Sequence, residues 1–249
     1  MNNFTEPLCI LKTRLFREHD ISLHVLSKER GFLTVYAFGG AKSRRRFIGC
    51  LDKFTIALCT VQKSMKRGYL TLQEASLIAS SKEFLHDTMK YGVVQNCALF
   101  LQVACRAWSY TSGVYTLFYD LLQACSDRED ILFAIPFFFR FSLVALLGYT
   151  PSLYSCVVCS RHIDSIALPF FSIEKGGLLC HSCSPFSSAL RIRDREILYV
   201  LQYILSFSPI YWKSIPYNKH SIQQVCALID EYVQYHLGVV WDNGRFIHV

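Results

Sequence analysis

The chain has 249 residues, which is enough for one large domain or for two to three small ones. A hydrophobic fraction of 52% and a charged fraction of only 18% exclude a wholly disordered chain. The 26 Lys and Arg residues outnumber the 19 Asp and Glu residues, and the formal charge of +7 favours an anionic partner such as nucleic acid or a membrane surface. An odd total of 11 cysteines fits a reducing compartment better than a disulfide framework, and Met1–Pro7 carries no secretory signal pattern.

Residues 1–80 have the alternating pattern of β-strands. Apolar and polar side chains alternate in five short runs, and turn-forming residues such as Gly31, Gly39, Gly49 and Gly68 separate them. Five short strands at this spacing predict a small barrel rather than an open sheet. The predicted strands are Cys9–Leu15, Ser22–Leu26, Phe32–Phe38, Thr55–Val61 and Tyr69–Ala75.

The densest positive charge in the chain follows the third predicted strand. Gly39 and Gly40 permit a sharp turn there, with Phe38 before them and Phe47 at the end of the loop. Cations neutralise phosphates and aromatic rings stack on bases, so the loop predicts binding to single-stranded nucleic acid, with an ordinary solvated hairpin loop as the alternative. The loop cations are Lys42, Arg44, Arg45 and Arg46, and the patch could extend over the barrel through Lys12, Arg14, Lys53, Lys63, Lys66 and Arg67.

Catalytic motifs are absent from the sequence. There is no GxGxxG after a predicted strand, no GxxxxGK[ST] loop, no HExxH and no GxSxG. Glu18, His19 and Asp20 are the residue types of a catalytic cluster, but adjacent residues point in different directions. We therefore expect a surface turn at these residues and no enzyme activity.

The pattern becomes helical near Ser80 and stays helical to about Gly148. Within it, Arg106, Trp108 and Tyr110 are interpreted as a helix end, with a binding lip as the alternative. We predict that a capping box at Ser80-x-x-Glu83 starts the first helix, and that the helical region is broken near Gly113, at Ser126-Asp127 and at Pro136.

One apolar segment, Ile131–Tyr149, is long enough to cross a membrane. Pro136 and Arg140 lie inside it, and an arginine at the bilayer centre costs about 2.5–3.5 kcal/mol. We therefore interpret the segment as a buried helix of a large core rather than as a membrane span.

Two further helices are predicted near the end of the chain. Asp194 is expected to cap a helix that runs to Leu205, and Ser221-x-x-Gln224 to cap a second helix that stops at Gly238. Residues 241–244 then read as a turn before a short strand, Arg245–Val249. The expected buried face of the second helix is Ile222, Val225, Ile229, Tyr232 and Val233.

Four cysteines carry the strongest signal. Cys156 and Cys159 form one C-x₂-C pair, residues 160–179 form a spacer, and Cys180 and Cys183 form a second pair. Two such pairs supply the four thiolates of a closed tetrahedral zinc site, which leaves no open position for water and so indicates scaffolding rather than catalysis. Gly176 and Gly177 permit a tight backbone before the second pair. The alternatives are ordinary buried cysteines, or a ligand role for His162 or His181.

Several of these stretches together resemble the RecO family of recombination mediators. The N-terminal part offers Gly31-Phe-Leu-Thr, the basic loop Gly39–Arg46 and Leu51-x-x-Phe54. The middle offers Phe137–Leu147 and a Leu-Gly-Tyr-Thr-Pro-Ser-Leu run that leads into the first cysteine pair. A Gly-Gly-Leu-Leu run leads into the second pair, and the resemblance covers nearly the whole chain.

The resemblance implies an α+β protein with an N-terminal OB-fold β-barrel, followed by an α-helical domain that carries a zinc-ribbon insert. We place the barrel at residues 1–80, the helical domain at residues 81–153 and 187–249, and the insert at residues 154–186. It implies a bacterial, cytoplasmic, nucleoid-associated protein that binds single- and double-stranded DNA and anneals complementary strands. With RecR, such a protein helps load RecA onto DNA coated by single-stranded-DNA-binding protein (SSB). The tail of SSB is expected to dock on the helical region, and the use of a RecF-type partner stays open.

Two other functions stay open at this point. One is an enzyme that processes nucleic acid and grips its substrate with the zinc ribbon. The other is a membrane-associated protein that uses Ile131–Tyr149. Metal-dependent nuclease activity would favour the first, and a membrane pellet that resists salt would favour the second.

Overall fold

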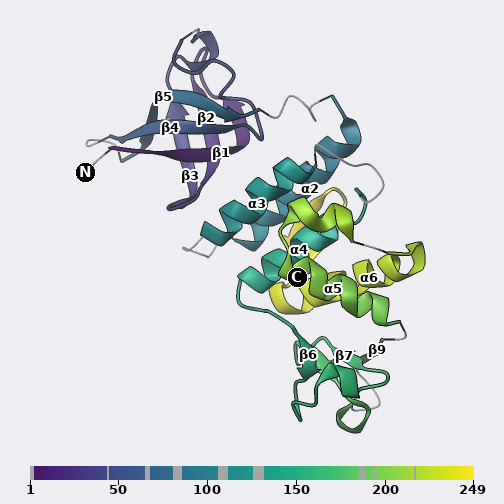
Figure 1. Cartoon of the computed structure of the whole chain (residues 1–249). Coiled ribbons are helices and arrows are strands. Elements are labelled where there is room, and N and C mark those ends of the chain that lie inside the picture. Colours follow the sequence, from purple (N-terminus) through teal and green to yellow (C-terminus); the bar gives the residue numbers. More distant parts are fainter. Residues whose placement is uncertain are drawn as a thin grey trace. The chain divides into compact units, whose positions relative to one another are not determined.

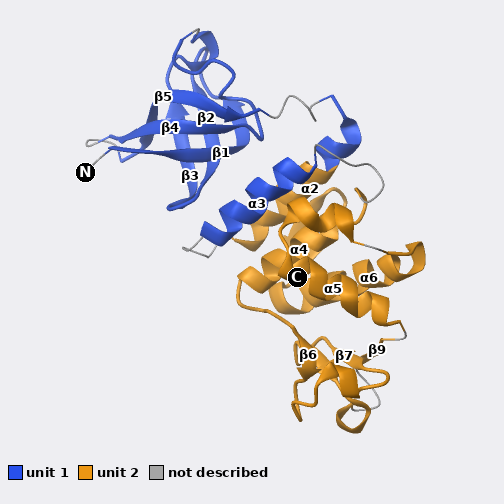
Figure 2. Cartoon of the chain, in the orientation of Figure 1, with its two compact units in different colours: residues 1–92, 107–126 blue, residues 93–106, 127–249 orange. Residues whose placement is uncertain are grey.

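The computed structural model describes residues 3–43, 45–64, 68–80, 86–105, 112–125, 132–184, 189–192, 194–215 and 217–249. The chain forms two compact units (Figure 2). The first comprises residues 1–92 and 107–126, and the second comprises residues 93–106 and 127–249. The N-terminal strands lie in the first unit, and the cysteine-rich insert lies in the second.

The N-terminal strands form a closed five-stranded barrel in the order β1-β2-β3-β5-β4 (Figure 1). Its β3–β5 pair is parallel, and the other pairs are antiparallel. All five predicted strands are confirmed, although the first begins earlier and the fifth ends later than expected. The strands are β1 (Asn3–Leu15), β2 (Ile21–Ser27), β3 (Gly31–Ala37), β4 (Ile56–Lys63) and β5 (Leu70–Ala79).

The barrel core follows from the two-residue period of the strands. Inward-facing apolar side chains alternate with side chains that face outward, so each strand contributes every second residue to one buried cluster. Gly40 sits at the end of this core, where a Cβ would lie 3.1 Å from both Ala37 Cβ and Leu51 Cδ1, so glycine permits close packing. The core includes Leu8, Ile10, Leu23, Val25, Val35, Ala37, Phe47, Cys59, Val61 and Leu72.

Among the described residues, the helices α2, α3 and α4 come next after the barrel. Asp87 Oδ1 accepts hydrogen bonds from the backbone N–H groups of Met89 (3.0 Å) and Lys90 (3.1 Å), which caps the first of them. Pro136 lies in the first turn of the third, where its missing N–H costs no hydrogen bond. The helices are α2 (Thr88–Ala104), α3 (Ser112–Ala124) and α4 (Ile135–Leu146).

Helix α4 explains the apolar segment that resembled a membrane span. Arg140 on this helix has only 8% of its side chain exposed, and its Nη1 donates to Asp230 Oδ1 at 2.6 Å. Its guanidinium also lies over the rings of Phe137 (4.6 Å) and Phe246 (5.2 Å). The arginine is therefore paired inside a protein core, which confirms the buried-helix interpretation. Among the described residues, every helix is too short or too polar to cross a lipid bilayer.

The insert between α4 and α5 is a small four-stranded sheet in the order β6-β8-β7-β9. Strands β6 and β8 pair in parallel, and a Cβ at Gly177 would lie 2.7 Å from the Ser152 backbone oxygen. Only glycine fits there without moving the backbone, because real Cβ contacts are not that short. The strands are β6 (Ser152–Cys156), β7 (Phe170–Ser172), β8 (Gly177–Leu179) and β9 (Leu190–Arg191).

Helices α5 (Arg195–Ser206) and α6 (Lys219–Leu237) pack in the second unit. Asp194 caps α5 as predicted, since its Oδ1 accepts from the Glu196 backbone N–H at 2.9 Å. The predicted cap of α6 at Ser221 is wrong. Asn218 caps it instead, by accepting from the Ser221 backbone N–H at 2.8 Å. Ser221 lies buried inside the helix, where its hydroxyl donates to carboxylate oxygens of Asp194 and Glu196.

The predicted stop and buried face of α6 and the final strand agree with the structure, but the predicted turn at residues 241–244 is partly wrong, because Trp241 and Asp242 belong to a strand. Gly238 ends α6 in the left-handed conformation (φ 60°), and all five predicted core residues of that helix are buried. The chain then forms a hairpin of β10 (Val239–Asp242) and β11 (Arg245–His248), whose first strand was not predicted. Three predictions lie outside the described residues: the capping box that needs Glu83, the break at Ser126-Asp127, and the lip at Arg106, Trp108 and Tyr110.

Candidate functional site

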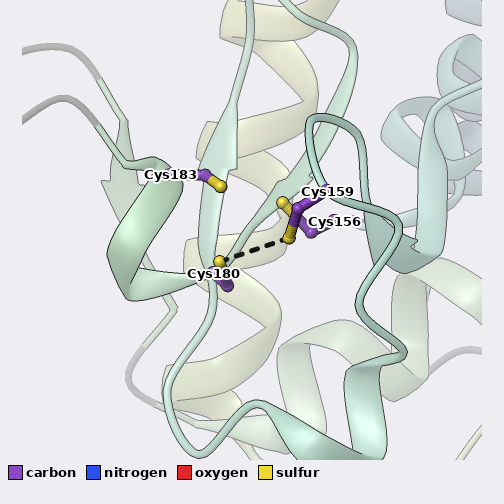
Figure 3. Close-up of side chains that lie close together, drawn as sticks. All are labelled: Cys156, Cys159, Cys180 and Cys183. Atoms are coloured by element: carbon purple, nitrogen blue, oxygen red, sulfur yellow. Dashed lines mark hydrogen bonds between the residues drawn. The ribbon is translucent and has the colours of Figure 1, made fainter.

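The four predicted cysteines converge in the insert and form a four-cysteine cluster: Cys156, Cys159, Cys180 and Cys183 (Figure 3). Their sulfur atoms all lie within 4.8 Å of one another, and the Sγ atoms of Cys159 and Cys180 are 3.7 Å apart. No other group of three or more metal-ligating side chains occurs among the described residues. Neither His162 nor His181 belongs to the cluster, so its donors are sulfur alone.

The geometry of the four-cysteine cluster fits a tetrahedral metal ion. Zinc–sulfur bonds of about 2.3 Å place two ligands of a tetrahedron about 3.8 Å apart. The sulfur separation of 3.7 Å between Cys159 and Cys180 matches that value. The four side chains point toward a common centre in Figure 3. The cluster could therefore hold a metal ion with all four positions filled by protein.

Local backbone bonds hold each cysteine pair. In the first pair, the Ser160 N–H donates to the Cys156 carbonyl at 2.8 Å, and Ser160 adopts the left-handed conformation (φ 58°). In the second, the Cys183 N–H donates to the Cys180 carbonyl at 3.0 Å. The Val157 N–H bonds the Leu178 carbonyl at 2.8 Å and ties the two pairs together. The pairs are thus positioned by the backbone that surrounds them.

The thiols of the four-cysteine cluster influence one another's ionisation. Burial opposes ionisation of Cys156, but hydrogen bonds from the backbone at Cys159, Cys180 and Val158 outweigh it and lower its pKa to about 6. Hydrogen bonds to Cys180 and Cys159 raise the pKa of Cys183 to about 12. Four thiolates this close repel one another, so a bound cation is what would allow all of them to ionise together.

The basic loop begins with a 3₁₀ turn, η1 (Gly40–Lys42), directly after β3. Gly39 takes the left-handed conformation (φ 67°), and its N–H donates to Asp20 Oδ1 at 2.8 Å. The Ala41 N–H donates to the His19 carbonyl at 3.1 Å. Residues 18–20 therefore form a turn that braces the loop, as the surface-turn interpretation expects.

The structure separates the predicted DNA-binding cations into groups. Lys42 and Arg45 are exposed on the loop, and Arg46 Nη2 donates to the Phe38 carbonyl at 2.8 Å. Lys53 is half-buried, and its ammonium lies over the rings of Phe54 (4.8 Å) and Tyr91 (5.5 Å). Lys53 is thus engaged in packing within the first unit. Lys63 ends β4, and Arg44, Lys66 and Arg67 lie outside the described residues.

Two other predicted cations lie on the outward side of the barrel, on strand β1. Residues opposite each other on paired strands share a face, so the strand register identifies their neighbours. The Thr34 hydroxyl and His24 Nδ1, 3.4 Å apart, confirm one such row across β2 and β3. We call this surface the outer barrel face; its two rows are Lys12–His24–Thr34 and Arg14–Ser22–Tyr36.

The charge of the outer barrel face acts on His24. Burial lowers the pKa of His24, and the positive charges of Lys12 and Arg14 lower it further. An imidazole in this position stays neutral near pH 7, because protonation would add a third positive charge beside Lys12 and Arg14 on the outer barrel face. Lys12 and Arg14 are therefore close enough to create a local positive potential.

Aromatic residues extend the outer barrel face in a way that the sequence did not reveal. Phe16, Tyr36, Phe38 and Tyr69 form an aromatic cluster, in which Tyr36 and Phe38 are stacked with ring centroids 6.4 Å apart. Of these, only Phe38 was predicted to stack on bases. The sequence does place aromatic residues at or next to the ends of predicted strands. Only the strand register, however, shows which of these residues lie together.

Phe47, the other aromatic residue of the predicted stacking loop, is not available for stacking. It is buried in the barrel core with 3% exposure, and the Arg46 guanidinium lies 4.7 Å from its ring centroid. The Ala75 N–H donates to the Arg46 carbonyl at 3.0 Å, which draws the end of the loop onto the barrel and turns Phe47 inward. The prediction of a stacking role for Phe47 is wrong.

Comparison with known proteins gives a consistent result over the whole chain. The family model "Recombination protein O N terminal" matches residues 1–81, and "Recombination protein O C terminal" matches residues 87–245. The chain is 31% identical over 247 residues to a protein of Nitratidesulfovibrio vulgaris named DNA repair protein RecO, with 98% of each chain covered. It is 32% identical over 243 residues to the protein of that name in Lawsonia intracellularis, with 96% of this chain and 97% of the relative covered.

Proposed function

Because the chain belongs to the RecO family of DNA repair proteins, we propose that it is a non-enzymatic recombination mediator that binds single- and double-stranded DNA and anneals complementary strands. The observation that carries this proposal is the combination of a closed barrel with cations on one outer side and in an adjoining loop. We propose that the barrel is an OB-fold, an architecture that uses the face of its second and third strands to bind oligonucleotides.

The proposed mechanism of annealing is electrostatic. Two DNA strands repel each other through their phosphates, and cations that contact both strands reduce that repulsion. We assign this role to Lys42, Arg44, Arg45 and Arg46 of the loop, together with Lys12 and Arg14 of the outer barrel face. Lys53 stays in the proposal through its charge, although its ammonium packs against Phe54 and Tyr91. The base pairs themselves then drive annealing.

The proposed partners follow from the family. With RecR, the protein would help to load RecA onto single-stranded DNA coated by SSB, and the tail of SSB would dock on the helical region. Whether RecF also participates stays open. These activities place the protein at the nucleoid in the bacterial cytoplasm.

We further propose that the metal of the four-cysteine cluster is zinc and that its role is structural. Four cysteine ligands leave no coordination position for a substrate, and zinc is the ion that such sets hold in zinc ribbons. Under this proposal residues 1–80 are the DNA-binding OB-fold and residues 154–186 are the zinc ribbon. Residues 81–153 and 187–249 form the helical domain.

The test is annealing of two complementary strands that are each coated with SSB before mixing. Plain DNA binding is not decisive, because a protein with a formal charge of +7 binds DNA at low salt without specificity. A fluorescent donor and acceptor on the two strands report annealing. We expect faster annealing with the protein than without it, and a smaller effect when the SSB lacks its C-terminal tail.

Two controls distinguish the proposed mediator activity from nonspecific annealing by positive charge. Uncoated strands measure the electrostatic contribution alone, and an equal charge concentration of polylysine measures nonspecific annealing. Acceleration by folded, metal-loaded protein that exceeds polylysine on coated strands supports the proposal. Absence of such acceleration refutes the mediator function and favours the nucleic-acid-processing enzyme, which a metal-dependent nuclease assay would then test.

A further inference from the structure

We propose that the aromatic cluster of the barrel is a stacking site for unpaired bases. Its rings would contact the bases of single-stranded DNA while nearby cations contact the phosphates. The inference deepens the proposed DNA-binding function and depends on it. The cluster comprises Phe16, Tyr36, Phe38 and Tyr69.

The rings form one connected group. Phe16 contacts Tyr36 edge-on with centroids 5.3 Å apart, and Tyr69 contacts Tyr36 at 5.8 Å and Phe38 at 5.9 Å. The rings of Tyr36 and Phe38 are nearly parallel, with an interplanar angle of 19°. Rings held this way by their neighbours have little rotational freedom left to lose when a base stacks on them.

The cluster is accessible to solvent. Phe16 is 41% exposed, and the other three rings are half-buried. None of the four belongs to the buried core of the barrel. Burial in the fold therefore leaves part of each ring without an apolar neighbour, and a stacked base would supply one.

Three cations lie near the cluster. The Arg17 guanidinium lies 5.5 Å from the Phe16 ring centroid, and Arg46 Nη2 bonds the Phe38 carbonyl at 2.8 Å. Arg14 shares a cross-strand row with Tyr36. Aromatic rings with cations close by match a polyanion that carries flat bases, because the backbone and the bases then find partners simultaneously.

The position of the cluster in the barrel supports the same ligand. Phe16 lies in the turn between β1 and β2, Tyr36 lies on β3, and Tyr69 lies just before β5. In oligonucleotide-binding barrels the ligand contacts the second and third strands and the loops that join strands one to two and four to five. The aromatic cluster therefore combines base-stacking chemistry with the place where such barrels bind a strand.

Two acidic residues lie in the turn that holds Phe16. Glu18 is exposed and lies 3.9 Å from His19 Nε2, whereas Asp20 is engaged by neighbouring groups. Asp20 accepts from the Gly39 N–H at 2.8 Å and pairs with Arg17 at 3.9 Å, so its charge is partly neutralised within the loop pair. An apolar protein segment would gain nothing from the three nearby arginines, whereas a phosphate backbone would. The observations thus favour single-stranded nucleic acid over a protein partner.

The experiment compares two oligonucleotides of equal length and charge: a deoxythymidine strand and an abasic strand with the same phosphates. Binding of each to the full-length, metal-loaded protein is measured by fluorescence anisotropy over a range of salt concentrations. The test variant combines Phe16→Leu, Phe38→Leu and Tyr69→Leu, which keep apolar volume but remove the aromatic faces. Tyr235→Leu, at an exposed tyrosine of α6, is the matched control.

We expect the wild-type protein to prefer the deoxythymidine strand, and each stacked base to account for roughly 5- to 150-fold of that preference. The triple variant keeps only Tyr36 of the four rings, so it should lose most of the preference for the deoxythymidine strand. Its salt slope and its affinity for duplex DNA, whose bases are already stacked, should be unchanged. Tyr235→Leu should retain the preference.

Three outcomes would overturn the inference. Equal binding of both strands by the wild-type protein removes the stacking site but leaves the proposed DNA-binding function intact. A parallel loss of duplex affinity in the triple variant, at unchanged thermal stability, means that the cluster supports a phosphate contact shared by both DNA forms instead. Binding of neither strand overturns the inference together with the proposed function. If the triple variant does not fold, Phe16→Leu alone, at the most exposed ring, is tested against the same two strands.

Discussion

The four-cysteine cluster draws its ligands from residues 156–183, whereas the outer barrel face draws Lys12, His24 and Tyr36 from three different strands. In the insert, backbone bonds between near neighbours set the geometry, such as the 2.8 Å bond from the Ser160 N–H to the Cys156 carbonyl. On the barrel, cross-strand register sets it. The first site is local in sequence and the second is not.

The two sites should also respond differently to the substitution of a single residue. A closed metal site needs all of its ligands, and its binding energy is folding energy, so one lost ligand should have a large effect. The outer barrel face has separate cations that contact separate phosphates, so each lost cation should have a small and additive effect. Loss of one cysteine ligand should therefore have a larger effect than loss of any one cation.

Cys156→Ser should remove the metal and unfold the insert. Structural zinc contributes about 10–16 kcal/mol in small zinc-binding peptides, and Cys156 is one of the four cluster thiols and is buried with 1% exposure. We expect loss of bound metal by elemental analysis and faster amide exchange in strands β6 and β8. The barrel strands belong to the other compact unit and should retain their protection.

Cys226→Ser provides the matched control, because Cys226 is also buried but lies outside the four-cysteine cluster. It should keep one metal ion per chain. Wild-type metal content in Cys156→Ser would contradict the metal site, and loss of metal in both variants would point to general unfolding instead.

Replacing Arg44, Arg45 and Arg46 with alanine should have a graded effect on DNA binding. For single-stranded DNA, each lost phosphate contact should lower the log–log salt slope by about 0.7. Affinity should fall alike for all sequences, since phosphate contacts carry no sequence information. Arg46 also bonds the Phe38 carbonyl, so circular dichroism must verify the fold of the triple variant.

Lys28→Ala is the charge control for that series. Lys28 is exposed in the turn between β2 and β3, at the other end of these strands from the basic loop. Its removal should leave the slope unchanged. An unchanged slope in the arginine variant as well would exclude the loop from the proposed mechanism.

The same contrast explains which features of the structure can be predicted from the sequence. The cysteine spacing predicted the four-cysteine cluster, and alternating runs predicted the five barrel strands, because both patterns are written in neighbouring residues. The cap of α6 was missed by three residues. Asn218 and Ser221 are both good capping residues, and only the packing of Ser221 against Asp194 and Glu196 decides between them.

The outer barrel face could not be predicted in the same way. Which residue of β2 lies beside Arg14 depends on register, and a shift of one residue would turn Ser22 away and bring a core residue to that position. The prediction that Phe47 stacks on bases was wrong for a related reason. Phe47 lies in a loop without strand periodicity, so its inward orientation became clear only from the bond between the Ala75 N–H and the Arg46 carbonyl.

The smallest predicted effect is on His24. Its pKa is lowered by burial and by Lys12 and Arg14, so replacing both cations with methionine should raise the pKa toward the ordinary value of about 6.5 without reaching it. With a folded pKa below the unfolded one, the unfolded state binds more protons, so His24 reduces stability as pH falls below about 6.5. The variant should lose less stability over that range. NMR titration of the imidazole protons measures the pKa directly.

His236, on α6, is the internal control for that titration, and its ring lies 3.0 Å from the Ile173 carbonyl of the insert. Burial lowers its pKa and a hydrogen bond with the Ile173 carbonyl opposes that shift, with no cation among the causes. The double variant should therefore move His24 and leave His236 unchanged. A bound DNA strand should also raise the pKa of His24, since its phosphates offset the same two cations. If His24 does not respond to their removal, Lys12 and Arg14 do not share a face with it, and the register that defines the outer barrel face is wrong.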